Sequence, residues 1–170
     1  RDRLRSRGLG DVYKRQDEHY PAGLTPAQIV EYISREKADA AAKLCTPEEI
    51  VITADTMVFL DGRKLGKPAD EAEALAMLTA LQGRHHTVCT GVTVITAEET
   101  RTFHETTEVH FYPLTPQEVA WYCSLEEPYD KAGAYAIQGR AAVWLDAIEG
   151  DYYTIMGLPV SRTVRLLEQF

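Results

Sequence analysis

Apolar residues recur with the helical spacing of three to four residues in four stretches of the chain. These stretches cover about 25–44, 70–82, 115–122 and the residues from 157 onward. Thr25, Asp70 and Thr115 open the first three, and each can accept a hydrogen bond from the backbone N–H three residues later. The pattern therefore predicts four helices. In the last helix, the residues expected to face the core are Val160, Val164 and Leu167.

Other stretches show the alternation or the short apolar runs that are typical of strands. Residues 50–60 are rich in β-branched side chains, contain a single acid, Asp55, and end at the turn dipeptide Asp61-Gly62. Residues 87–96 and 101–112 alternate apolar with polar side chains across a short polar turn, which predicts a β-hairpin. A further short strand is expected near 143–145.

Composition and charge narrow the class of protein. The chain has 170 residues, of which 45% are hydrophobic and 26% charged, as in one globular domain. Its net charge of −8 argues against a general nucleic-acid-binding protein, which needs a basic surface. No apolar stretch is long enough to span a membrane. Cys45, Cys89 and Cys123 form no CxxC pair and fit the reduced thiols of a cytoplasmic protein.

The first 16 residues differ from the rest of the chain. Residues 1–16 carry six basic against two acidic side chains and show neither helical nor strand periodicity. A basic arm that binds nucleic acid is one interpretation. We instead expect a foreign or disordered leader, followed by a single domain over 17–170.

One acid and two lysines stand out as candidate site residues. Asp55 interrupts an apolar run, and a buried carboxylate is costly unless it is paired, hydrogen-bonded or bound to metal. The plainer interpretation is a strand-end acid that reaches solvent. Lys67 lies in the loop Gly66-Lys67-Pro68, and Lys37 lies on the apolar stripe of the first helix, where it either extends along the core to solvent or points into a cleft. Asp55 and Lys67, both at the edge of a buried sheet, indicate a site for an anionic, metal-bound substrate.

Several longer motifs extend this picture. The longest covers residues 52–92 and begins ITADTMVFLDGRKLGKP. The others are TTEVHF at 106–111, DKAGAYAIQG at 130–139 and GDYYTIMGLP at 150–159. With these motifs in this order, residues 17–170 resemble the Maf family of nucleoside triphosphate pyrophosphatases, first described as inhibitors of septum formation. The glutamine of the Ile-Gln-Gly string, Gln138, is typical of the branch that acts on dTTP and UTP.

The resemblance implies a charged catalytic cleft. Asp55 matches the family's proton acceptor, and Glu18, Lys37 and Lys67 match charged residues that handle metal and phosphates. Glu18 and Asp55 are the expected ligands of a divalent cation, Mg²⁺ or Mn²⁺, since hard oxygen ligands suit both ions. Lys131 matches a further motif lysine on the substrate side.

The resemblance also implies how the base is chosen and how the fold is built. Thr56 and Gln138 match positions tied to base specificity among dTTP, UTP and modified pyrimidine nucleotides. The implied fold is α/β, a twisted mixed β-sheet flanked by helices, in two lobes with a central cleft, and the implied assembly is a homodimer.

The chain departs from the family at its start. Family members open with a strand and a Ser-x-Ser-Pro-Arg-Arg loop that holds the phosphates, and residues 1–16 match neither. We therefore expect the strand at 50–60 to lack a pairing partner, and activity to be impaired. The alternative function is a non-catalytic nucleotide-binding regulator of cell division.

Overall fold

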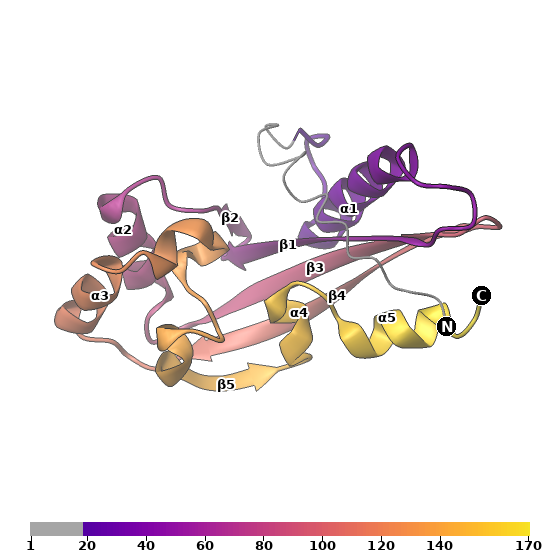
Figure 1. The fold of residues 1–170 in the computed structure, drawn as a ribbon. Helices are drawn as coiled ribbons and strands as arrows, with labels where there is room; N and C mark the ends of the chain where they lie inside the picture. The colour runs from indigo at the N-terminus through magenta and orange to yellow at the C-terminus, as the bar shows by residue number, and fades with distance from the viewer. Residues whose placement is uncertain (1–18) are drawn as a thin grey trace.

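The computed structural model describes residues 19–170, which form one five-stranded sheet with helices packed on it (Figure 1). The strand order is β2-β1-β3-β4-β5. The strands are β1 (Val51–Leu60), β2 (Arg63–Leu65), β3 (His85–Ile95), β4 (Thr100–Phe111) and β5 (Leu145–Glu149). The α/β class and the β3–β4 hairpin are thus as the sequence predicts.

The sheet differs from the mixed sheet that was expected. Every strand pair within residues 19–170 is antiparallel. For two of the pairs the physical reason is a tight turn, which joins β1 to β2 and β3 to β4 and reverses the chain direction. Longer connections join β1 to β3 and β4 to β5. The turn after β1 uses Asp61 and Gly62, both with positive φ (51° and 75°), as the Asp-Gly dipeptide predicts.

The predicted helices form where their capping signals lie. They are α1 (Pro26–Ala42), α2 (Glu71–Leu81), α3 (Pro116–Cys123) and, without a side-chain cap, α5 (Val160–Leu167); a short helix, α4 (Tyr152–Met156), forms in addition. Thr25 and Thr115 each make the complete capping box, and Asp70 accepts from the backbone N–H of Glu73 at 2.9 Å. The helix α2 is buried through the four residues that its apolar spacing indicates, Ala74, Met77, Leu78 and Leu81.

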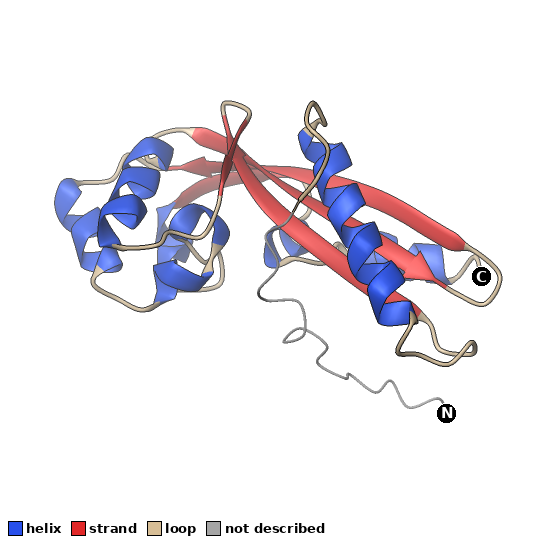
Figure 2. Ribbon diagram, turned by 90° about the horizontal axis from the view of Figure 1, so that it is seen from above, coloured by secondary structure: helices blue, strands red, loops and turns tan. Residues whose placement is uncertain are grey.

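Four of the helices gather in two groups at the two ends of the long strands, and α4 lies between these groups (Figure 1). The helices α2 and α3 pack at one end around the largest hydrophobic core. At the other end α1 lies across one face of the sheet (Figure 2), burying Ile29, Val30 and Ile33 against Met57 and Phe59. The helix α5 packs on the opposite face. Residues near the middle of β1 therefore lie between the two helical groups.

In the C-terminal third of the chain, several expectations drawn from the local sequence pattern are wrong. Residues 143–145 were expected to form a strand, but 3₁₀ turns (Glu127–Asp130, Ala132–Ala134 and Arg140–Trp144) precede β5. The short helix α4 was not predicted. The expectation that Val160 and Val164 face the core is wrong, since they are 39% and 47% exposed while Thr163 is buried. The helix α5 meets the sheet through Leu166 and Leu167 instead.

One edge of β1 is only partly paired among the described residues. The short strand β2 pairs with Val58, Phe59 and Leu60, and within residues 19–170 no strand pairs with Val51–Met57 on that side. The leader at 1–16, and Glu18 with it, lies outside the described residues. No helix in the described part of the chain is long and apolar enough to cross a membrane, and all three cysteines are free thiols.

Candidate active site

The side chain of Asp55 lies on the face of β1 that α1 covers, and it is only 8% exposed. The Nζ of Lys37, in the second half of α1, donates a hydrogen bond to Oδ1 of Asp55. Asp55 is therefore a buried, paired acid and not one that simply reaches solvent. Of the two placements open to Lys37, the structure directs its ammonium at β1, and 31% of the side chain stays exposed.

A glycine opposite Asp55 lets α1 come close to the sheet. Gly91 is the direct cross-strand partner of Asp55 on β3, and a Cβ on it would lie 2.3 Å from the backbone oxygen of Val30. Thr53 then fixes the helix by donating to the backbone oxygen of Ser34 at 2.6 Å. Sequence reasoning missed Gly91, although glycine inside a strand pattern is a known sign of close backbone approach.

Thr56 follows Asp55 and therefore points to the opposite face of β1. Its hydroxyl lies 2.8 Å from that of Thr90 on β3. A Cβ on Gly157, at the end of α4, would lie 3.6 Å from Thr56 Oγ1. The structure thus places the expected base-selecting threonine beside α4, on the other side of the strand from the expected catalytic acid.

Lys67 and Lys131 lie in two loops that are joined by a backbone hydrogen bond. The backbone N–H of Gly133 donates to the oxygen of Gly66 at 3.0 Å. Lys131 Nζ lies 2.7 Å from both carboxylate oxygens of Asp130. This hydrogen-bonded ammonium, with a smaller contribution from Lys67, lowers the pKa of Asp130. Lys67 itself is exposed, so the two loops present lysine charge at the surface.

Gln138 lies on an exposed turn, and the carboxylate of Glu127 accepts a backbone hydrogen bond from that turn. Oε1 of Glu127 accepts from the backbone N–H of Arg140 and from the hydroxyl of Tyr122, each at 2.9 Å. A Cβ on Gly139 would lie 1.7 Å from the same oxygen. The Gly of the Ile-Gln-Gly string is therefore needed for Glu127 to reach this turn. No local signal in the sequence identified Glu127 as its support.

The described residues fit a divalent cation only in part. Within residues 19–170, no three His, Cys, Asp or Glu side chains converge as metal ligands. Mg²⁺, however, is commonly held by one or two carboxylates together with substrate phosphates. Asp55 is a suitably buried oxygen donor for that arrangement, whereas Glu18 lies outside the described residues.

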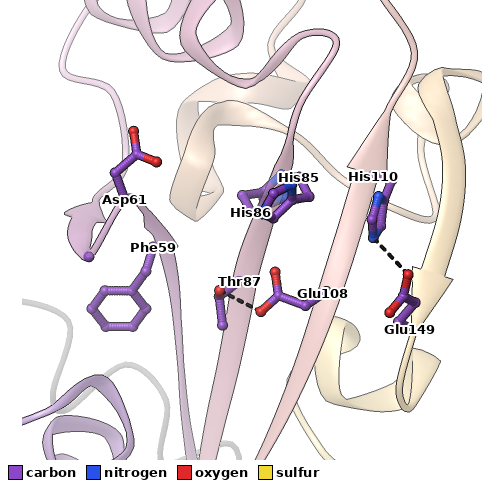
Figure 3. Close-up of a pocket in the computed structure, with 9 residues that line it drawn as sticks. Phe59, Asp61, His85, His86, Thr87, Glu108, His110 and Glu149 are labelled. Carbon is purple, nitrogen blue, oxygen red and sulfur yellow. Dashed lines mark hydrogen bonds and ion pairs between the residues drawn. The ribbon is translucent and has the colours of Figure 1, made fainter.

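A separate polar hollow of about 440 Å³ lies further along the face of the sheet that carries Asp55 (Figure 3). None of the expected site residues within 19–170 lines it. Its carboxylates already have partners, since Thr87 donates to Glu108 at 2.6 Å and His110 Nε2 lies 3.2 Å from Glu149. The hollow is therefore distinct from the residues that the sequence singles out.

His86, one of the residues that line this hollow, is buried and its imidazole is neutral at pH 7. His86 is 2% exposed, and its Nε2 lies 2.7 Å from the hydroxyl of Tyr135. Its Nδ1 makes no hydrogen bond to any residue within 19–170. Burial, and then the nearby His110 and His85, lowers the pKa of His86 from 6.5 to about 4.

We expect His86→Gln to weaken the acid sensitivity of the fold. In the unfolded chain His86 takes up a proton below pH 6.5, but in the folded chain only near pH 4. Between these values protonation favours the unfolded state, so stability present above pH 6.5 is lost as the pH falls, by about 3 kcal/mol at most. Urea unfolding from pH 4 to 7 measures this loss. His85→Gln, at an exposed site, is the control, and an unchanged pH dependence in His86→Gln would contradict the assignment.

Comparison with known proteins gives the family. The sequence model described as "Maf-like protein" matches residues 6–170. The chain is 49% identical to a dTTP/UTP pyrophosphatase of Symbiobacterium thermophilum over 91% of this chain and 79% of that protein. It is 47% identical to one of Bacillus cytotoxicus over 94% of this chain and 83% of that protein. Both matches far exceed what chance similarity gives, and the chain belongs to the Maf family.

Proposed function

We propose that this chain is a nucleoside triphosphate pyrophosphatase that hydrolyses dTTP and UTP to the monophosphate and pyrophosphate. The observation that carries the proposal is the buried Asp55, which Lys37 on α1 holds in place on the central strand. The relatives named dTTP/UTP pyrophosphatase support the choice of substrate.

In the proposed reaction, water attacks the α-phosphorus and the bond between that phosphorus and the bridging oxygen to the β-phosphate breaks. Asp55 takes a proton from the attacking water, and pyrophosphate leaves with the bridging oxygen. Lys37 orients the carboxylate through its hydrogen bond. Lys67 and Lys131 act as point charges on phosphate oxygens, where they stabilise the charge that develops on the leaving group.

A divalent cation, when bound with the substrate, neutralises phosphate charge and polarises the phosphoryl oxygens. Asp55, with Glu18, would supply its protein oxygens. Two roles are therefore open to Asp55: it would accept the proton of the attacking water, or it would be a ligand of the ion.

The proposed base contacts come from Thr56 and Gln138. A glutamine amide can donate and accept at once, which suits the mixed hydrogen-bonding edge of a pyrimidine. We further propose that the substrate occupies a cleft between the two helical groups, that the chain acts as a homodimer and that it works in the cytoplasm, where nucleoside triphosphates are made and used.

Product analysis tests the proposal directly. The purified chain is incubated with dTTP or UTP and Mg²⁺, and pyrophosphate and orthophosphate are measured separately. Pyrophosphate with equimolar monophosphate supports the proposal. Orthophosphate alone would indicate cleavage of the terminal phosphate. Saturable binding with unchanged nucleotide would indicate the non-catalytic regulator instead.

We expect Gln138→Ala to weaken discrimination among bases more than it slows the best substrate. A lost polar partner costs roughly 1–3 kcal/mol where the contact is desolvated, which corresponds to a change in relative rate of about 5-fold to 150-fold. The ratios of kcat/KM for dTTP, UTP, CTP and GTP measure this change. Gln117→Ala, at an exposed position on α3, is the control. Unchanged ratios in Gln138→Ala would remove the residue from base recognition.

A further inference from the structure

Two threonines face each other across the middle of the sheet, on the side that α4 covers. Thr56 on β1 and Thr90 on β3 are direct cross-strand partners, and their hydroxyl oxygens are 2.8 Å apart. Thr90 is fully buried, whereas Thr56 is half-buried. Distance alone leaves open which hydroxyl donates the hydrogen bond.

The next contact in the network decides the direction. The hydroxyl of Thr90 also lies 2.6 Å from the backbone oxygen of Thr154, to which it donates. A carbonyl oxygen has no proton, so the single proton of Thr90 is used there. In the contact between the two hydroxyls, Thr56 must then donate and Thr90 must accept. Thr56 Oγ1 is left with lone pairs only.

The carbonyl that sets this direction cannot easily turn away. The backbone N–H of Thr154 donates to the carboxylate of Asp151 at 2.9 Å, which caps α4. Asp151 is held in turn by Thr107 on β4, whose hydroxyl accepts from its backbone N–H at 3.0 Å. The backbone N–H of Gly157 donates to the oxygen of Thr154 at 3.2 Å. The proton direction is therefore built into the packing of α4 on the sheet.

Gly157 lies beside the Thr56 hydroxyl and places no side chain there. This residue ends α4 with φ +111°, a backbone conformation that side-chain-bearing residues rarely adopt. A Cβ there would touch Thr56 Oγ1 at 3.6 Å. A ligand approaching along this side meets backbone and an oxygen that can only accept.

We propose that Thr90 is a positioning residue that sets which pyrimidine the site accepts. By fixing Thr56 as an acceptor, it favours a base with an N–H donor at the centre of its pairing edge. Uracil and thymine carry that donor at N3, whereas the unprotonated N3 of cytosine would face the lone pairs of Thr56. This inference rests on the proposed function, in which Thr56 contacts the base.

The test compares Thr90→Val, Thr90→Ser and Thr56→Val with the parent chain. Without the Thr90 hydroxyl, Thr56 is free to rotate and can donate to cytosine as readily as it accepts from uracil. The preference for UTP over CTP in kcat/KM is expected to fall at least ~10-fold in Thr90→Val and to return in Thr90→Ser. The control is Thr163→Val, which also removes a buried threonine hydroxyl that donates to a backbone carbonyl, that of Pro159 at 2.9 Å. Thr90→Ala replaces the valine variant if valine prevents folding.

Binding separates failure of this inference from failure of the proposed function. Calorimetry with the α,β-imido analogues of UTP and CTP gives the same selectivity without turnover. If the parent chain releases no pyrophosphate, the binding ratios still decide the role of Thr90. An unchanged ratio in Thr90→Val, with a changed one in Thr56→Val, would overturn the inference and leave the base contact standing. Unchanged ratios in both variants would overturn it as well, because Thr56 would then not contact the base.

Discussion

Asp55→Asn lowers the rate of pyrophosphate release by at least ~100-fold, the scale on which general base catalysis contributes. The amide keeps the size and shape of the carboxylate, and its oxygen can still accept the hydrogen bond from Lys37 that holds Asp55 in place. What the substitution removes is the ability to take a proton or to bind a cation strongly. The loss is therefore chemical, and we expect the melting temperature to change little.

The rate of pyrophosphate formation in a single turnover measures this loss, because product dissociation does not limit that rate. Asp61→Asn is a matched control, because Asp61 follows β1, pairs with Arg84 at 2.7 Å and is largely exposed. Asparagine also tolerates the positive φ of 51° at that position. A near-parental rate in Asp55→Asn would show that Asp55 is neither the base nor an essential ligand.

Gly91→Ala is expected to cost on the order of 3 kcal/mol of stability, the upper range for overpacking. The added methyl group would lie 2.3 Å from the backbone oxygen and 2.4 Å from the carbonyl carbon of Val30. Backbone atoms within a helix cannot move aside as a flexible side chain can. The helix α1 must therefore rise from the sheet.

The same displacement of α1 should also disturb the candidate active site. The hydrogen bond from Lys37 to Asp55 forms only while α1 packs closely on the sheet. Lower stability in urea unfolding should accompany lower activity at temperatures where the variant remains folded. Gly66→Ala is the stability control, since a Cβ there meets no atom within 4 Å. A Gly91→Ala protein with parental stability would mean that α1 sits further from β3 than the structure places it.

Local signals in the sequence determined the elements that depend on neighbouring residues. Capping at Thr25 and Thr115, and the buried face of α2, arise from side chains three or four positions apart. The same locality explains the failures near the C-terminus. The apolar spacing of Val160 and Val164 predicts a buried face, but in the fold α5 approaches the sheet with a different side.

For the candidate site, the sequence motifs singled out Asp55, Lys37 and Thr56 but carried no information on how they meet. The pairing of Lys37 with Asp55 joins residues 18 positions apart, and it depends on how closely α1 docks over Gly91. The direction of the Thr56 hydrogen bond depends on a carbonyl in α4, far along the chain. Only the tertiary structure decides such contacts, because each requires two elements to pack at a fixed distance.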